Sequence, residues 1–116
     1  MEELVPRFVA IGYGDEAGYE RTDKLIRADA HAHDAKLQQA GVEMGMAGRA
    51  VQVRNHETKE VTVSEGPFMR SELPVAGFAL IEAADLAEAI EIVSKTPCAV
   101  AYGVVEVWPL EQRLGS

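Results

Sequence analysis

The sequence predicts one α+β domain, in which a small antiparallel sheet packs against helices. Three observations lead to this class. Short runs rich in β-branched residues predict strands, and two longer segments carry helix start and stop signals. These segments also follow one another in the order strand, helix, hairpin, strand, helix, strand. The chain has 116 residues, of which 47% are hydrophobic and 26% charged, as in ordinary globular proteins. No repeat or linker divides it, so we expect a single domain over residues 1–116.

The first half of the chain predicts a strand followed by a helix. Residues 7–13, RFVAIGY, form a strand by their β-branched and aromatic content. A turn-rich connection follows and ends at Thr22 or Asp23, either of which can cap a helix. The helix runs over residues 24–40 and stops at Gly41, because glycine tolerates the left-handed conformation past a helix C-terminus.

The middle of the chain predicts a hairpin. Residues 42–57 alternate in polarity with glycine interruptions, which gives one broken strand or two short ones. Val51 and Val53 then point to one face, and Gln52 and Arg54 to the other. A polar turn returns the chain into a strand over residues 60–64, which completes the hairpin.

The last third predicts an interior strand, a helix and a final strand. The run AGFALIEA, residues 76–83, is apolar on both faces and therefore belongs at the centre of the sheet. Asp85 can cap the following helix, and Glu88 reaches back to it in a capping box. Pro97 is predicted to end that helix, and residues 101–108 form the last strand. On the helix, one face is predicted to carry Leu86, Ile90 and Val93.

This order of elements matches a ferredoxin-like, or split βαβ, sheet with an extra hairpin and with both helices on one face. The opposite face then lacks a cover and is too apolar to leave in water. A second copy of the protein is the natural lid. We therefore expect a homodimer that joins through the sheet face, in a dimeric α/β-barrel type of assembly.

Charge and composition exclude several classes of protein. The net charge is −8, and no Lys/Arg cluster offsets it, so nucleic acid is not an expected partner. The longest apolar runs, 73–81 and 98–105, are far shorter than the ~20 residues that span a bilayer, and no basic segment opens the chain. We expect a cytoplasmic protein with no membrane partner. Cys98, the one cysteine, lies among apolar residues that raise a thiol pKa. No metal-binding spacing and no dinucleotide fingerprint occurs, so no metal or cofactor is expected.

Several segments carry a resemblance that covers residues 7–109. They are YGDE, AGV, EGPF, GFALIEAADLAEAIEI and GVVEVWP. With them the chain resembles the YCII-related family, in its DGPF branch. The resemblance implies a ferredoxin-like α+β domain that dimerises through its sheets, with an activity that is mostly unassigned. Glu65 stands where the branch has Asp, and its longer side chain weakens the local turn. Some members pair a histidine of the first helix with an Asp late in the second; the corresponding late position here reads SKTPC, with Thr96.

The first helix offers a candidate catalytic pair. His33 falls on an inward stripe, and Asp29 lies four residues before it, close enough for a carboxylate–imidazole contact. The carboxylate fixes the imidazole tautomer and raises its pKa while burial lowers it, which suits general acid/base work. The alternative is a polar pair with a structural role only. The stripe consists of Ile26, Ala30, His33, Leu37 and Ala40.

The EGPF turn is the candidate substrate-binding segment. It comprises Glu65, Gly66, Pro67 and Phe68, and Phe68 is expected to fold back onto apolar surface. Arg49 is added because a guanidinium binds anionic groups bidentately. The alternative is a plain turn flanked by surface ion pairs. Two other histidines are set aside: one as solvated surface on the first helix and one in the hairpin loop, His31 and His56.

Two functional classes are favoured, and a third possibility is also left open. The first is a small-molecule enzyme of lyase or isomerase type that uses Asp29 and His33. The second is a noncatalytic module that binds a small ligand or another protein. A third, a cofactor-independent monooxygenase, requires a large apolar pocket. The fold does not choose among them, because one small sheet supports many functions.

Overall fold

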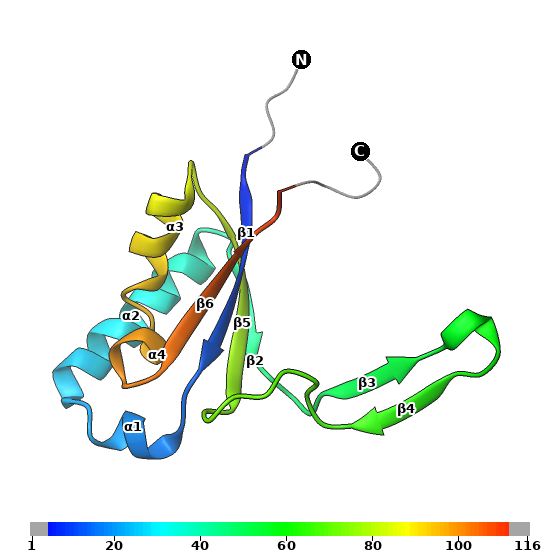
Figure 1. Cartoon of the computed structure of the whole chain (residues 1–116). Helices are drawn as coiled ribbons and strands as arrows, with labels where there is room; N and C mark the ends of the chain where they lie inside the picture. The colour runs from blue at the N-terminus through cyan, green and yellow to red at the C-terminus, as the bar shows by residue number, and fades with distance from the viewer. Residues whose placement is uncertain (1–4, 112–116) are drawn as a thin grey trace.

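The computed structural model describes residues 5–111. Figure 1 shows the helices gathered on one side of a twisted sheet and a hairpin that projects away from it. The elements in chain order are β1 (Arg7–Tyr13), α1 (Glu16–Glu20), α2 (Lys24–Gln39), β2 (Glu43–Met46), β3 (Val51–Arg54), the 3₁₀ turn η1 (His56–Thr58), β4 (Thr62–Glu65), β5 (Val75–Glu82), α3 (Leu86–Val93), α4 (Pro97–Val100) and β6 (Val104–Pro109).

The main sheet has four strands in the order β2-β5-β1-β6, and every neighbouring pair is antiparallel. This α+β arrangement is compatible with the predicted ferredoxin-like topology. The predicted interior position of the AGFALIEA strand is confirmed, since β5 lies between β2 and β1. Of the two possibilities for residues 42–57, the structure shows two strands in different sheets: β2 joins the main sheet, and β3 pairs with β4 in the hairpin.

The predicted caps of both long helices are confirmed. Asp23 accepts a hydrogen bond from the Leu25 amide at 2.8 Å at the start of α2. The chain leaves that helix through Gly41, whose φ of 98° lies in the left-handed region. Asp85 accepts from the Glu88 amide at 2.9 Å at the start of α3. None of the helices within residues 5–111 has the length and hydrophobicity that crossing a membrane requires.

Two short helices were not predicted. The connection after β1 contains α1, and a further helical turn, α4, precedes β6. The expectation that Pro97 ends the second helix is wrong, because α3 already ends at Val93 and Pro97 begins α4. Proline suits the first position of a helix, where its missing N–H has no intrahelical partner to lose.

The hydrophobic core lies between the main sheet and its helices. The face predicted for the second helix is only partly correct, because Leu86 and Ile90 are about half exposed, while Ala89 and Val93 are buried against the sheet. Alanine at position 89 lets the helix approach closely. The buried core residues are Phe8, Ala10, Ile81, Ala83, Ala89 and Val93.

The opposite side of the sheet carries no helix (Figure 1). Strand alternation places there the residues between those that face the core. Three large side chains on this side, Phe78, Val104 and Trp108, are 50%, 55% and 53% exposed. We call this surface the open face. It consists of Val9, Ile11, Phe78, Leu80, Val104 and Trp108.

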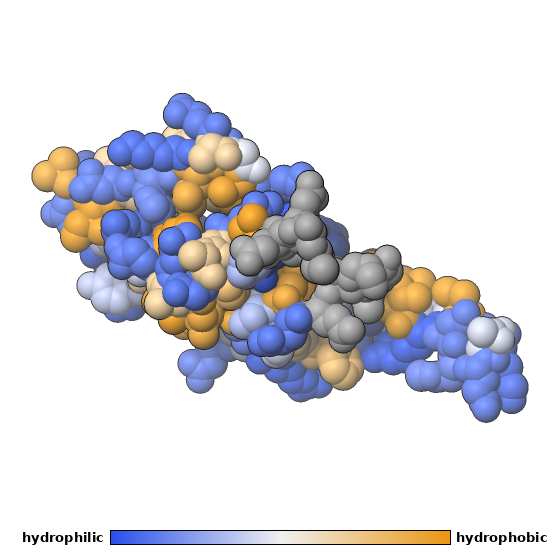
Figure 2. All heavy atoms as spheres, turned by 90° about the horizontal axis from the view of Figure 1, so that it is seen from above, coloured by the Kyte–Doolittle hydropathy of each residue, from blue (hydrophilic) through white to orange (hydrophobic). Residues whose placement is uncertain are grey.

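The hairpin of β3 and β4, here called the arm (residues 51–65), also has an apolar and a polar side. The predicted alternation is confirmed: Val53 pairs with Val63 across the strands, and both are more than half exposed. On the other side, Arg54 Nη2 donates to Gln52 Oε1 at 2.8 Å. Figure 2 shows hydrophobic residues along one edge of the arm and hydrophilic residues along the rest.

Candidate functional site

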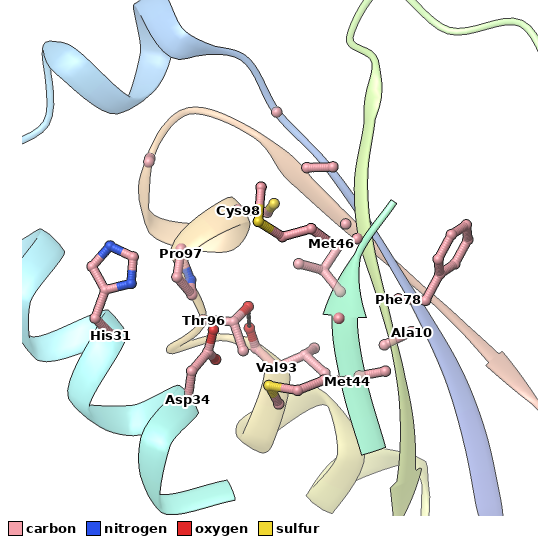
Figure 3. Close-up of a pocket in the computed structure, with 18 of the residues that line it drawn as sticks. Ala10, His31, Asp34, Met44, Met46, Phe78, Val93, Thr96, Pro97 and Cys98 are labelled. Carbon is pink, nitrogen blue, oxygen red and sulfur yellow. Dashed lines mark hydrogen bonds between the residues drawn. The ribbon is translucent and has the colours of Figure 1, made fainter. Parts of the chain in front are cut away.

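A pocket of about 650 Å³ opens between α2, α4 and the helix-facing side of the sheet (Figure 3). Its lining comes from the helices α1 to α4 and from the four strands of the main sheet, so segments distant in sequence build it together. The volume falls within the ~300–1,000 Å³ usual for small-molecule sites. The wall is mostly apolar, with a few polar groups at the helix side.

The hollow exists because two neighbouring strands carry very small residues where they face the helices. Ala10 of β1 lies opposite Ala79 of β5, and Gly12 lies opposite Gly77. No side chain at these positions is large enough to fill the space above the sheet. A Cβ on Gly12 would lie 2.9 Å from Cys98 Sγ, so this glycine also lets α4 settle close to β1.

Among the described residues that line the pocket, Asp34 has a buried side-chain oxygen without a hydrogen-bond partner. It lies on α2, and the buried atom is its Oδ1. Burial raises the pKa of Asp34, and the nearby His33 and His31 rings act in the opposite direction. Figure 3 shows its side chain reaching toward Thr96. The Thr96 hydroxyl is already used, since it donates to the Val93 carbonyl at 2.7 Å.

Cys98 lies across the pocket from α2, on α4, and is half-buried. Burial raises the pKa of its thiol, as predicted from its apolar neighbours, and the Asp34 carboxylate raises it further. The sulfur therefore remains a thiol at neutral pH rather than a thiolate nucleophile. Within residues 5–111, no three carboxylate, imidazole or thiol groups are arranged to hold a metal ion.

His31 lies at the mouth of the pocket, which the sequence analysis did not expect. The ring is exposed, as predicted, but it lines the pocket, and its Nε2 lies 2.9 Å from the Tyr19 hydroxyl of α1. The prediction of a solvated surface residue is confirmed, and its place in the pocket lining was not predicted. The signal that was missed is the spacing of His31 and Asp34, since residues three apart share a helix face.

The predicted pair Asp29 and His33 lies outside this pocket. His33 is half-buried, and its Nε2 donates to the carbonyl of Ile92 near the end of α3 at 2.7 Å. Asp29 is exposed, and no hydrogen bond or ion pair joins it to His33 in the described part of the chain. The expected i, i+4 contact is not formed, and the ring instead ties α2 to α3. A catalytic role for the pair stays a prediction.

Replacing Asp29 and His33 one at a time shows whether His33 stabilises the fold alone or together with Asp29. His33→Ala is expected to lower the free energy of unfolding by about 1–2 kcal/mol, because the Ile92 carbonyl loses its donor. Asp29→Ala, at an exposed position, is expected to change it by less than about 0.5 kcal/mol. Urea unfolding of both variants measures this. Equal losses, with no further loss in the double variant, would show that the two side chains act together after all.

The EGPF turn lies at the base of the arm and is not part of the pocket lining. Gly66 has a φ of 97°, which favours glycine, and its amide donates to the Ala50 carbonyl at 2.9 Å. The expectation that Phe68 folds back onto apolar surface is wrong, because its side chain is 77% exposed. The structure thus brings none of the predicted substrate-binding residues to the pocket: Arg49, Glu65, Gly66, Pro67 and Phe68.

The fold and the pocket define a small α+β domain with a concave site beneath its first long helix. The YCII-related domain model matches residues 7–112, and the chain belongs to this family. The family resemblance of the sequence is thereby confirmed, whereas the assignment to the DGPF branch stays a prediction. A comparison with curated proteins finds no match.

Proposed function

We propose that this protein binds a small, mostly apolar molecule in the pocket between α2, α4 and the sheet, and that Asp34 recognises its polar end. The observation that carries this proposal is the buried, unpartnered Oδ1 of Asp34 in an otherwise apolar wall. Buried polar atoms in folded proteins nearly always have a partner. A ligand donor in the pocket would supply one here.

The same carboxyl is suited to exchange a proton with the bound molecule. A carboxyl group whose pKa is raised by burial transfers protons more effectively near neutral pH than an ordinary one. His31, at the mouth of the pocket with Tyr19, adds a second polar contact on the same helix face. Asp34 and His31 thus take the roles that the sequence analysis gave to Asp29 and His33, in a lyase- or isomerase-type reaction.

A noncatalytic binding module is the second candidate. It is favoured by the 2.9 Å contact between His31 Nε2 and the Tyr19 hydroxyl, because no hydrogen bond joins the imidazole to the buried Oδ1 of Asp34. Both candidates need the same pocket. They differ in whether the bound molecule leaves chemically changed, which NMR spectra of the ligand after incubation would show.

We also propose that the protein is a homodimer whose second copy covers the open face, in a barrel-type assembly. Three large side chains there, Phe78, Val104 and Trp108, are about half exposed. Exposed apolar patches of this kind commonly mark interaction sites. The side of the arm that carries the exposed valines is a further apolar surface that a second copy could cover, because a lone two-stranded hairpin does not bury it.

Filling the pocket tests the binding proposal. In ¹⁵N-resolved NMR titrations with a mixture of small aromatic fragments, we expect the amides of Gly12 and Gly77 to shift. Ala35→Trp places an indole at the pocket wall and should abolish these shifts. Ala32→Trp is the matched control, because Ala32 is exposed on the same helix but does not line the pocket. Unchanged binding to Ala35→Trp would place the site elsewhere.

A further inference from the structure

Among the described residues, carboxylates outnumber the groups on the pocket wall that can carry a positive charge. Three carboxylates line it, those of Asp15, Glu16 and Asp34, whereas no Lys or Arg among residues 5–111 does. The whole chain carries a net charge of −8. A cleft in which one sign of charge predominates concentrates ligands of the opposite sign and repels those of its own. An anionic ligand is therefore disfavoured.

Two arginines near the pocket stack on aromatic rings, one of which, Tyr19, lines the pocket. The guanidinium of Arg27 lies 4.7 Å from the ring centre of Tyr19, and that of Arg21 lies 4.0 Å from the ring centre of Tyr102. Neither arginine lines the pocket. Among the described residues, the groups near Asp34 that can carry a positive charge are thus the imidazoles of His31 and His33, and no ammonium or guanidinium group lines the pocket.

We infer that the molecule bound in this pocket is an apolar amine whose ammonium group donates hydrogen bonds to the Asp34 carboxylate. The inference rests on the proposed function, of which it specifies the ligand class. The hydrocarbon body of the amine lies along the small residues of β1 and β5. Met44 and Met46 line the pocket at the β2 edge, and Met46 is almost fully exposed, so its flexible side chain is free to close over a ligand.

Three polar end groups on the same apolar body would interact differently with Asp34. An ammonium forms charge-assisted hydrogen bonds with a carboxylate, which are about twice as strong as neutral ones. A hydroxyl would donate a hydrogen bond to the unpartnered oxygen of Asp34 but would leave its negative charge unbalanced. A carboxylate on the ligand would add a second negative charge. The titratable groups that face Asp34 or share its pocket are His31 and His33 of α2, Cys98 of α4, and Asp15, Glu16 and Tyr19 at α1.

Three commercial probes with a common phenylethyl body test this class: phenethylamine, phenethyl alcohol and phenylpropionate. Their dissociation constants are measured at neutral pH by ¹⁵N-resolved NMR titration on the intact chain. Phenethylamine is expected to bind at least about tenfold more tightly than the alcohol. Phenylpropionate is expected to bind more weakly than either.

Two substitutions on α2 complete the test. Asp34→Asn removes the charge and should bring phenethylamine down to the affinity of the alcohol. Asp29→Asn removes a carboxylate from the same helix outside the pocket and should leave the preference intact. Equal binding of amine and alcohol to the wild type, or an unchanged preference in Asp34→Asn, would overturn the amine inference while leaving a small-molecule pocket. Absence of pocket shifts with all three probes would overturn the proposed function as well.

Discussion

Trp108→Glu is expected to convert the proposed dimer into a monomer. Trp108 lies on β6 beside Val9 of β1, and its side chain is 53% exposed on the open face. In a dimer joined through that face the indole would be buried, and a glutamate would place an unpaired charge in an apolar interface. Loss of a central aromatic residue commonly costs about 2–4 kcal/mol of association, which is about a 30- to 1,000-fold rise in the dimer dissociation constant.

Sedimentation equilibrium over a range of protein concentrations measures this effect. Leu25→Glu is the matched control, because Leu25 is a large hydrophobic residue that is even more exposed and lies at the start of α2, away from the open face. It should leave the assembly unchanged. A wild-type protein that is monomeric at high micromolar concentration, or a dimer that dissociates only in Leu25→Glu, would refute the sheet-face dimer.

The strands and long helices could be predicted because their signals are local. Cap residues such as Asp85, and Gly41 after α2, fix helix ends through bonds to neighbouring amides or through one allowed backbone region. The short helices α1 and α4 carry no such periodicity in four or five residues. Pro97 was misread for this reason, since proline marks the end of one helix or the beginning of the next with equal ease.

The pocket could not be predicted because it depends on pairings across the sheet. Gly12 lies opposite Gly77 because of the register between β1 and β5, and these two strands lie far apart in the chain. Likewise, the inward stripe of the first helix pointed to His33. The hydrogen-bond partner of His33 is the backbone carbonyl of Ile92, which no side-chain pattern reveals. Asp34 was overlooked because an acidic residue on a helix is normally solvated.

Asp34→Asn is expected to stabilise the free protein while it weakens amine binding. The wild-type carboxyl has a buried oxygen without a partner, and burial raises its pKa. An amide at this position carries no charge to desolvate, so at neutral pH the variant should gain about 0.5–1 kcal/mol in the free energy of unfolding. A substitution that raises stability but weakens binding typically affects a residue that serves function.

The pH dependence of that gain distinguishes a charge effect from a change in packing. An acid whose pKa is raised in the folded state favours folding only while it is protonated, so the wild type loses stability as pH rises from the ordinary value near 3.8 through the raised one. The difference between Asp34→Asn and wild type should therefore vanish below pH ~4 and reach a plateau above the folded-state pKa. The nearby His31 and His33 rings lower the pKa of Asp34 and so oppose the effect of burial. Urea unfolding at several pH values measures this difference in the free energy of unfolding, with Asp29→Asn as the exposed control. A difference that does not change with pH would mean that the side chain of Asp34 affects stability through packing and not through its charge.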